Sequence, residues 1–320
     1  MNYSTLSTIG LGMASIGRPH YINIKQEKVV SEDLDAFWQQ GWRALDHAYA
    51  AGIRYFDTAP GYGFAEKLLI EWLLQQQPQD VEVATKWGYT YTANFDINAP
   101  VHELKEHSLS KLNHQWQQSQ ALLPYFKTYQ IHSATLESGV LENQEVLHQL
   151  AELKEQHQLT MGLSVSGEEQ LTILQKALSI QINGLDLFDA FQMTYNILDQ
   201  SVADTLPELR QKNKRIIVKE ALANGRLFPT AQYSHYMPLY QTLNQLATAY
   251  GVGVDAIALR FSFEMLAPCI VLSGGYTPQQ IDENLKALNF SFTQDELEIL
   301  KTFAVSPRAY WQERKSLQWN

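Results

Sequence analysis

Short apolar runs alternate with longer amphipathic segments along the whole chain, and this alternation constrains the fold more than any other feature. The runs are rich in β-branched and aromatic residues, which is typical of strands buried on both faces of a parallel sheet. Eight runs are found, at residues 8–11, 53–57, 81–86, 127–132, 160–164, 185–191, 215–219 and 269–273. Strict alternation of strands and helices predicts a parallel sheet, and eight units over 320 residues favour a closed α/β barrel, the (β/α)8 TIM barrel.

The segments between the runs carry apolar residues at helical spacing. Helices are predicted at residues 34–51, 66–76, 104–123, 143–157, 168–180, 202–211, 239–250, 254–266 and 278–288. Gly52 is expected just after the end of the first helix, and Thr277 and Pro278 at the start of the last. A further C-terminal helix is predicted at 290–303, outside the repeat. Because no Pro/Gly/Ser-rich linker interrupts the chain, residues 1–320 are interpreted as a single domain.

Charge and cysteine content exclude several classes of function. Lys and Arg number 24 against 34 Asp and Glu, so the net charge is −10, which disfavours binding to nucleic acid or to an anionic membrane surface. No apolar window approaches the about 18 residues of a membrane span, and the N-terminus lacks signal-peptide features. The single cysteine, Cys269, forms no disulfide within the chain, so we expect a cytoplasmic protein. Its expected assembly is a monomer or a small homo-oligomer.

Polar residues at the C-terminal ends of barrel strands are site candidates, because barrel enzymes keep their active sites there. The strand ends supply Asp57, Lys86, His132, Ser164, Gln192 and Lys219. An Asp, a Lys and a His in a buried barrel mouth are costly unless they pair. A purely structural Asp57–Lys86 ion pair with a core histidine is the alternative interpretation. Convergence of the three on one mouth favours a functional site.

Tyr62 adds a fourth candidate, five residues after Asp57 in a turn rich in proline and glycine that can bring its ring over the mouth. A free phenol has a pKa of about 10, and a nearby cation lowers it. We expect Lys86 to supply that charge, Asp57 to orient Lys86, and His132 to bind the same substrate oxygen as Tyr62. Such a set protonates a carbonyl oxygen while hydride reaches its carbon.

Several segments resemble the motifs of one family. Gly-Ile-Arg-Tyr-Phe-Asp-Thr-Ala-Pro-Gly-Tyr-Gly at 52–63, followed by Glu66, resembles the second-strand signature of the aldo-keto reductase superfamily. Five later segments of the chain resemble the superfamily's motifs on the third to sixth strands and in the closing cofactor segment. They are Ala-Thr-Lys at 84–86, Tyr-Gln-Ile-His at 129–132, Gly-Leu-Ser at 162–164, Gln192 with Tyr-Asn at 195–196, and Thr-Pro-Gln-Gln-Ile-Asp-Glu-Asn-Leu at 277–285. The resemblance implies an oxidoreductase that uses NADP(H) or NAD(H) to reduce an aldehyde or ketone to an alcohol, or the reverse.

The resemblance also implies roles. Tyr62 would be the general acid, tuned by Lys86 and Asp57, and His132 would orient the carbonyl. Ser164 and Gln192 would contact the nicotinamide carboxamide. Further cofactor contacts are implied for Lys219, Asn224, Gly225, Arg226 (on the pyrophosphate), Leu227, Gly274, Gly275, Tyr276, Gln280 and Asn284. Trp87, His20 and Tyr21 are candidates for the substrate pocket.

Three positions depart from the family pattern. Val165 stands where an asparagine usually follows Ser164, and Lys219–Glu220 stand where many members place an aromatic residue against the nicotinamide. NADP-preferring members place a cation at the positions of Gly274 and Gln280. A 2′-phosphate needs charge-assisted partners, so this segment favours NAD whereas common family usage favours NADP, and the choice remains open.

Two other classes of function remain as alternatives. A non-catalytic, nucleotide-sensing barrel subunit would not need the intact set of four. A barrel isomerase or lyase would need clustered carboxylates or metal ligands at several strand ends, which the sequence lacks. His102 and His107 would diverge by about 140° on a helix, so they do not share a metal face, and no metal is expected.

Overall fold

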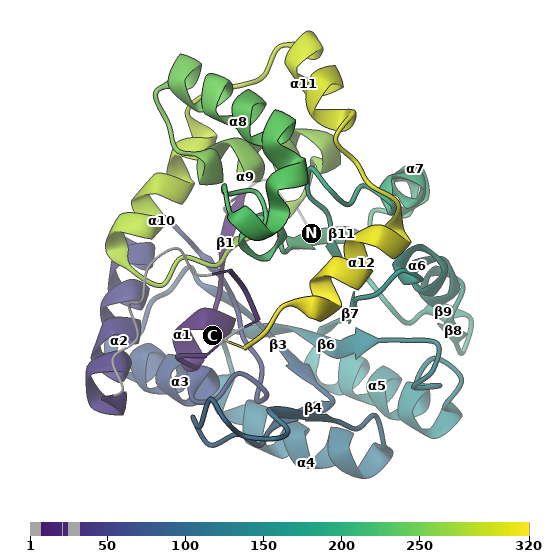
Figure 1. Ribbon diagram of the computed structural model, residues 1–320. Helices are drawn as coiled ribbons and strands as arrows, with labels where there is room; N and C mark the ends of the chain where they lie inside the picture. The colour runs from purple at the N-terminus through teal and green to yellow at the C-terminus, as the bar shows by residue number, and fades with distance from the viewer. Residues whose placement is uncertain (1–7, 21, 25–32, 320) are drawn as a thin grey trace.

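The computed structural model describes residues 8–20, 22–24 and 33–319 and contains the predicted barrel (Figure 1). Eight parallel strands close in the order β1-β12-β11-β10-β7-β6-β3-β2. Their bounds are β1 Ile9–Gly12, β2 Tyr55–Asp57, β3 Glu82–Trp87, β6 Phe126–Ala134, β7 Thr160–Val165, β10 Ala190–Thr194, β11 Arg215–Lys219 and β12 Ile270–Ser273. The (β/α)8 fold class predicted from the alternation of runs is thus confirmed.

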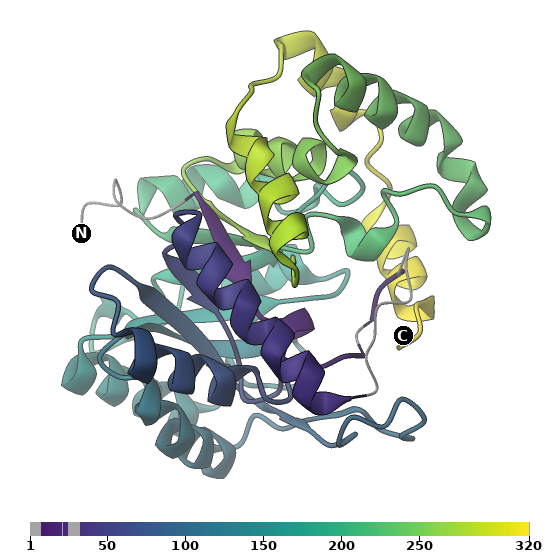
Figure 2. The same ribbon diagram turned by 90° about the vertical axis from the view of Figure 1, so that its left-hand side faces the viewer.

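Helices surround the strands, and Figure 2 shows this layer from the side of α2. The helices that follow the eight barrel strands are α2 Leu34–Ala50, α3 Ala65–Gln76, α4 Leu109–Ser119, α5 Gln144–His157, α6 Gln170–Leu178, α7 Leu206–Gln211, α8 Met237–Tyr250 and α10 Pro278–Leu285. The additional helices are α1 Ala14–Gly17, α9 Val254–Leu266, α11 Gln294–Lys301 and α12 Pro307–Ser316. Short 3-10 turns are η2 Gln120–Leu122, η3 Ala203–Thr205, η4 Ala223–Gly225, η5 Ala231–Tyr236 and η6 Lys286–Leu288.

Local capping explains where the helices begin and end. The Thr277 hydroxyl accepts a hydrogen bond from the Gln280 N–H at 3.2 Å, with Pro278 in the first turn of α10, as the sequence predicts. Gly52 follows α2 with φ 97°, a left-handed conformation that glycine adopts without strain. These caps set the positions at which the chain turns back toward the next strand.

The sixth strand begins later than predicted. The run at 185–191 divides, because Leu185–Asp186 (β9) pairs antiparallel with Gln181–Ile182 (β8) in a separate hairpin. Asn183 and Gly184 have φ values of 53° and 79°, the combination that a tight two-residue hairpin requires. The barrel strand β10 therefore starts at Ala190, which carries Gln192 into the barrel mouth.

The helix predicted at 104–123 is also shorter than expected. Residues Glu103–Lys105 (β5) pair antiparallel with Tyr89–Tyr91 (β4), and α4 starts only after Ser108, whose hydroxyl accepts from the Lys111 N–H at 3.1 Å. The resulting hairpin lies after β3, at the end of the barrel where the polar strand ends gather. It places Tyr89 and Glu103 near the candidate site.

Helix α12 was not predicted. It lies after the predicted C-terminal helix and docks on the loops that follow β10 and β11. Asn196 Nδ2 donates to the Tyr310 hydroxyl at 2.9 Å, and Trp311 Nε1 donates to Asp199 Oδ2 at 3.1 Å. Its amphipathic pattern covers only ten residues, which explains why helical spacing did not reveal it.

Apolar side chains fill the inside of the barrel below the polar strand ends. Six of them, contributed by five strands, form a buried cluster distinct from the larger one between strands and helices: Tyr55, Ala84, Ala190, Ile217, Ile270 and Leu272. No single helix of the described residues is long and apolar enough to cross a membrane. Two consecutive helical segments, Ala231–Tyr250 and Val254–Leu266, reach the required length and apolar composition only when taken together, and their axes bend by 93° at the break between them.

Candidate active site

A buried polar network joins four barrel strands, β2, β3, β6 and β10. Lys86, at the end of β3, forms an ion pair with Asp57 at the end of β2 and donates to the Thr58 carbonyl at 3.1 Å. The second carboxylate oxygen of Asp57 accepts from Gln192 Nε2 at 2.8 Å and from Gln130 Nε2 at 3.2 Å. Lys86 is fully buried and Asp57 is 2% exposed. The two opposite charges are therefore buried in contact with each other, and each carboxylate oxygen has a partner.

Tyr62 and His132 lie beside this pair. The Tyr62 hydroxyl is 3.3 Å from His132 Nε2, and the two rings meet edge to face with centroids 5.3 Å apart. Lys86 Nζ lies 5.0 Å from the centre of the Tyr62 ring. The structure thus brings together the four candidate residues from the sequence, which are Asp57, Tyr62, Lys86 and His132.

Burial raises the pKa of the Tyr62 phenol well above its usual value, and the Asp57 carboxylate raises it further. The Arg18 guanidinium opposes this shift, whereas Glu103 and Glu220 add to it. The net shift of this pKa is therefore opposite to the lowering that the sequence predicted. Burial destabilises the phenolate more than the Lys86 cation, which is paired with Asp57, stabilises it.

His132 is neutral at neutral pH. Burial lowers its pKa well below the usual value, and the Lys86 and Arg18 charges lower it further. Its ring packs against Tyr89 at 4.7 Å between centroids, and its main-chain carbonyl accepts from His107 Nε2 at 3.0 Å. A neutral imidazole held in this way can share a hydrogen bond with both Tyr62 and a substrate oxygen.

A cavity of about 930 Å³ runs from this network to the start of α10. It is lined by Asp57 and Tyr62 and by nine of the residues predicted to contact the cofactor: Gln192, Lys219, Asn224, Gly225, Gly274, Gly275, Tyr276, Gln280 and Asn284. Sequence reasoning missed further lining residues, among them Met13, Ser15, Glu220, Phe228, Asp255 and Glu283. Ser15, Asp255 and Glu283 lie in α1, α9 and α10, and the other three lie in loops. Glu283 falls within the 277–285 motif and Glu220 follows Lys219, so these two had a sequence signal, whereas the others belong to no motif.

The cavity is large enough for a nicotinamide dinucleotide, because its volume is that of a pocket for a cofactor-sized ligand. Two lining positions leave room for one: the buried Asn224 Oδ1 has no hydrogen-bond partner, and a Cβ atom on Gly274 would meet no atom within 4 Å. Asn284 Nδ2 donates to Ser273 Oγ at 2.7 Å and so holds the closing loop in place.

Arg226 lies elsewhere than predicted. Its fully buried guanidinium donates to the carbonyls of Ala223 at 2.9 Å and Tyr310 at 3.0 Å, pairs with Glu313 at 3.2 Å, and stacks over the Tyr310 ring at 4.1 Å. It does not line the cavity. Through these partners Arg226 links α12 to the 223–226 turn. The predicted contact of Arg226 with the cofactor pyrophosphate is therefore wrong, because its guanidinium is buried against α12 and away from the cavity.

Other predicted contacts also fall outside the cavity lining. Ser164 is 1% exposed and its hydroxyl accepts from the Ser133 N–H at 2.8 Å. Leu227 and Trp87 are fully buried core residues, which corrects both assignments. His20 is partly buried and does not line the cavity. Tyr21 lies outside the described residues.

Arg18 is a site residue that the sequence did not reveal. Its guanidinium forms an ion pair with Glu103 in the β4–β5 hairpin, donates to the Gly61 carbonyl at 3.1 Å, and lies 5.3 Å from the centre of the Tyr62 ring. It also lies 4.9 Å from the ring of Trp319. Because these partners are far apart in sequence, only the folded chain shows that they surround Tyr62.

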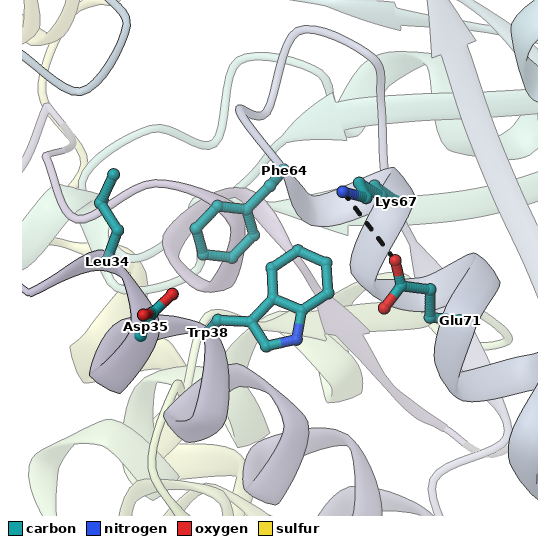
Figure 3. Close-up of a pocket in the computed structure, with 6 residues that line it drawn as sticks. All are labelled: Leu34, Asp35, Trp38, Phe64, Lys67 and Glu71. Carbon is teal, nitrogen blue, oxygen red and sulfur yellow. Dashed lines mark ion pairs between the residues drawn. The ribbon is translucent and has the colours of Figure 1, made fainter.

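A second, smaller cavity of about 320 Å³ lies on the outside of the barrel between α2 and α3 (Figure 3). The rings of Trp38 and Phe64 meet at its centre with centroids 4.9 Å apart, and Lys67 pairs with Glu71 at 4.0 Å. It shares no lining residue with the larger cavity, and we assign it no function. In the described part of the chain no group of three His, Cys, Asp or Glu residues could hold a metal ion.

Comparisons with known proteins identify the family of the chain. The model of the Aldo/keto reductase family matches residues 8–304. The L-galactose dehydrogenase of Arabidopsis thaliana is 28% identical, with 75% of each chain covered, and the NADH-specific methylglyoxal reductase of Escherichia coli K12 is 23% identical, with 94% of this chain and 95% of the relative covered.

Solved structures have the same fold. An aldo-keto reductase from Bacillus halodurans in its holo form superposes with a TM-score of 0.71 at 19% identity, covering 94% of this chain and 93% of the other. The glycerol dehydrogenase of Gluconobacter oxydans gives a TM-score of 0.69 at 22% identity, covering 93% and 91%. The family match covers nearly the whole chain, so this protein belongs to the aldo/keto reductase family.

Proposed function

We propose that the protein interconverts a small polar aldehyde or ketone and its alcohol with a nicotinamide cofactor, using Tyr62 as the proton donor. One observation carries the proposal. The Tyr62 hydroxyl lies 3.3 Å from Nε2 of a neutral histidine, His132, at the end of a cavity of cofactor size. No purely structural role requires a phenol in the lining of such a cavity, with an imidazole and a buried ion pair beside it.

The residues have distinct tasks in this reaction. When bound, the reduced nicotinamide supplies a hydride to the carbonyl carbon. Tyr62 donates its proton to the carbonyl oxygen, and its raised pKa keeps that proton in place until the oxygen becomes basic. His132 binds the same oxygen. The Lys86 ammonium, 5.0 Å from the Tyr62 ring, stabilises the negative charge that develops on the phenol oxygen.

The small polar substrate is supported by the relatives and by the mouth of the site. The relatives act, by their names, on methylglyoxal, L-galactose and glycerol. Here the Arg18 guanidinium, paired with Glu103, lies near the rings of Tyr62 and Trp319, and Tyr89 packs against His132. Aromatic rings with one charged pair beside Tyr62 suit a small molecule that carries hydroxyl or carbonyl groups.

The far end of the cavity favours NADH over NADPH. Since the nicotinamide must reach Tyr62, the adenosine half belongs at the start of α10, where the described lining residues include the carboxylates of Asp255 and Glu283. The nearby Lys286 ammonium is bound by both oxygens of Glu283 at 2.7 Å. Carboxylates accept hydrogen bonds from ribose hydroxyls but repel a 2′-phosphate.

The test of the function follows the absorbance of NADH with a panel of small aldehydes and ketones. We expect Tyr62→Phe to lower kcat/KM at least about 1000-fold while the Kd for NADH changes less than about threefold. Tyr89→Phe is the matched control, because it removes a hydroxyl from the other ring that packs against His132; we expect a loss below about tenfold. Unchanged turnover in Tyr62→Phe would refute the proposal. NADH binding without turnover on any carbonyl would support the nucleotide-sensing alternative instead.

The cofactor preference is tested with both reduced cofactors. We expect kcat/KM to be at least about tenfold higher with NADH than with NADPH, and Glu283→Arg to narrow that ratio by adding a cation and releasing Lys286. A strong preference of the wild-type protein for NADPH would overturn the electrostatic argument.

A further inference from the structure

Lys219 is the only cation among the described residues that line the large cavity. Its ammonium donates to two neutral hydroxyls, Ser166 Oγ at 3.0 Å and Thr194 Oγ1 at 2.8 Å. The carboxylate of Glu220 is 4.0 Å away, beyond hydrogen-bond contact. Only 17% of the Lys219 side chain is exposed. This cation is therefore held by neutral groups in a mostly buried position.

Glu220 does not neutralise Lys219 completely, because its carboxylate is shared. One of its oxygens accepts from Arg314 Nε at 3.3 Å and from a second Arg314 nitrogen at 3.1 Å. Although burial raises the pKa of Glu220, the Arg314 and Lys219 charges outweigh it and hold that pKa at about 2. Glu220 is thus a stable anion flanked by two cations.

Lys219 lies at the catalytic end of the cavity. It ends β11 and pairs in register with Thr194 of β10, two residues after Gln192, whose amide binds Asp57. Its charge is also close enough to His132 to contribute to the lowered pKa of that histidine. The ring that exchanges hydride with the substrate must bind at this end, since Tyr62 is there.

We propose that Lys219 sets the balance between the oxidised and reduced cofactor, an inference that rests on the proposed function. The two forms of the nicotinamide ring differ by one hydride, so the oxidised ring carries one more positive charge than the reduced ring. A fixed ammonium at this end destabilises the cationic form selectively. When an alcohol is oxidised, its carbon gives up that hydride and its hydroxyl proton leaves through Tyr62. Lys219 therefore favours this direction on the protein and tightens binding of NADH relative to NAD+.

A contact between Lys219 and the pyrophosphate makes a different prediction. Oxidised and reduced cofactors carry the same pyrophosphate, so loss of that contact would weaken both equally. ADP-ribose, which has the pyrophosphate but no nicotinamide, would weaken to the same extent. The three ligands together therefore distinguish the two placements of the charge.

The experiment is isothermal titration of NAD+, NADH and ADP-ribose into the wild-type protein and its variants. We expect Lys219→Met to lower the ratio Kd(NAD+)/Kd(NADH) about tenfold and to change the Kd of ADP-ribose less than about twofold. Lys219→Arg keeps the charge, and Ser166→Ala removes one hydrogen-bond partner without changing charge. Both controls should leave the ratio within about twofold of the wild-type value.

Glu220→Gln supplies a test of opposite sign that does not depend on the stability of Lys219→Met. Removing this anion leaves Lys219 and Arg314 less compensated, so the ratio should rise. An unchanged ratio in Lys219→Met, an equal loss for all three ligands, or a fall in Glu220→Gln would overturn the inference. If the wild-type protein bound none of the three ligands and no NADPH either, the proposed function itself would fail.

Discussion

Replacing Arg226 with methionine separates an anchoring role for this residue from a cofactor role. Methionine retains much of the buried volume but removes the charge and every donor. In the wild-type protein the guanidinium donates hydrogen bonds to the carbonyls of Ala223 and Tyr310 and lies 4.1 Å from the centre of the Tyr310 ring. The variant therefore detaches α12 from the 223–226 turn without opening a large void.

The expected cost follows from these contacts. Each of the two lost hydrogen bonds from a charged donor to a buried carbonyl contributes about 1.5 kcal/mol net, and the stacking on Tyr310 contributes about another 1 kcal/mol. We expect the free energy of unfolding to fall by about 4 kcal/mol. With an unfolding entropy of about 2 cal/mol/K per residue over 320 residues, Tm should fall by about 6 °C.

Urea denaturation followed by circular dichroism measures the change in stability, and titration with NADH measures binding in the same preparation. Arg308→Ala is the matched control, because Arg308 is an exposed arginine on the same helix; its effect should stay within about 0.5 kcal/mol. The anchoring role predicts a large loss of stability and a Kd for NADH within about threefold of wild type. Unchanged stability with a Kd raised tenfold or more would show that Arg226 holds the cofactor after all.

Three other predictions concern buried charges. Asp57→Asn leaves the fully buried Lys86 ammonium without its carboxylate and should cost about 3–5 kcal/mol by urea denaturation; a loss below about 1 kcal/mol would contradict the network. Burial raises the pKa of Glu66 from 4.5 to about 7, so the folded protein holds this proton more tightly than the unfolded chain and loses stability as pH rises between those values. Relative to Glu66→Gln, the wild-type unfolding free energy should fall by about 3 kcal/mol from about pH 4.5 to 8, and parallel pH profiles would refute this. The lowered pKa of His132 predicts no inflection in kcat/KM from this residue between about pH 6 and 8, so an inflection that disappears in His132→Gln would contradict it.

Much of the fold followed from local sequence pattern. The alternation of apolar runs and amphipathic segments depends only on residues near one another, and it predicted the closed barrel together with α9 at its observed bounds. Asp57, Lys86 and His132 could be predicted as a group because parallel strands that all end on one side of a barrel bring their C-terminal residues together. The boundaries that were wrong, at β10 and α4, depend on hairpin pairing between separate segments.

The tertiary structure alone decided which side chains meet across long sequence separations. Arg226 resembles a cofactor-loop residue by its neighbours in sequence, but its partner Tyr310 lies 84 positions away. Arg18 lies beside Tyr62 and pairs with Glu103 of the β4–β5 hairpin, 85 positions away in sequence. The direction of the Tyr62 pKa shift likewise depends on burial and on charges from several loops. Sequence order determines the strands and their polar ends, whereas pairing, burial and electrostatic balance arise from contacts that exist only in the folded chain.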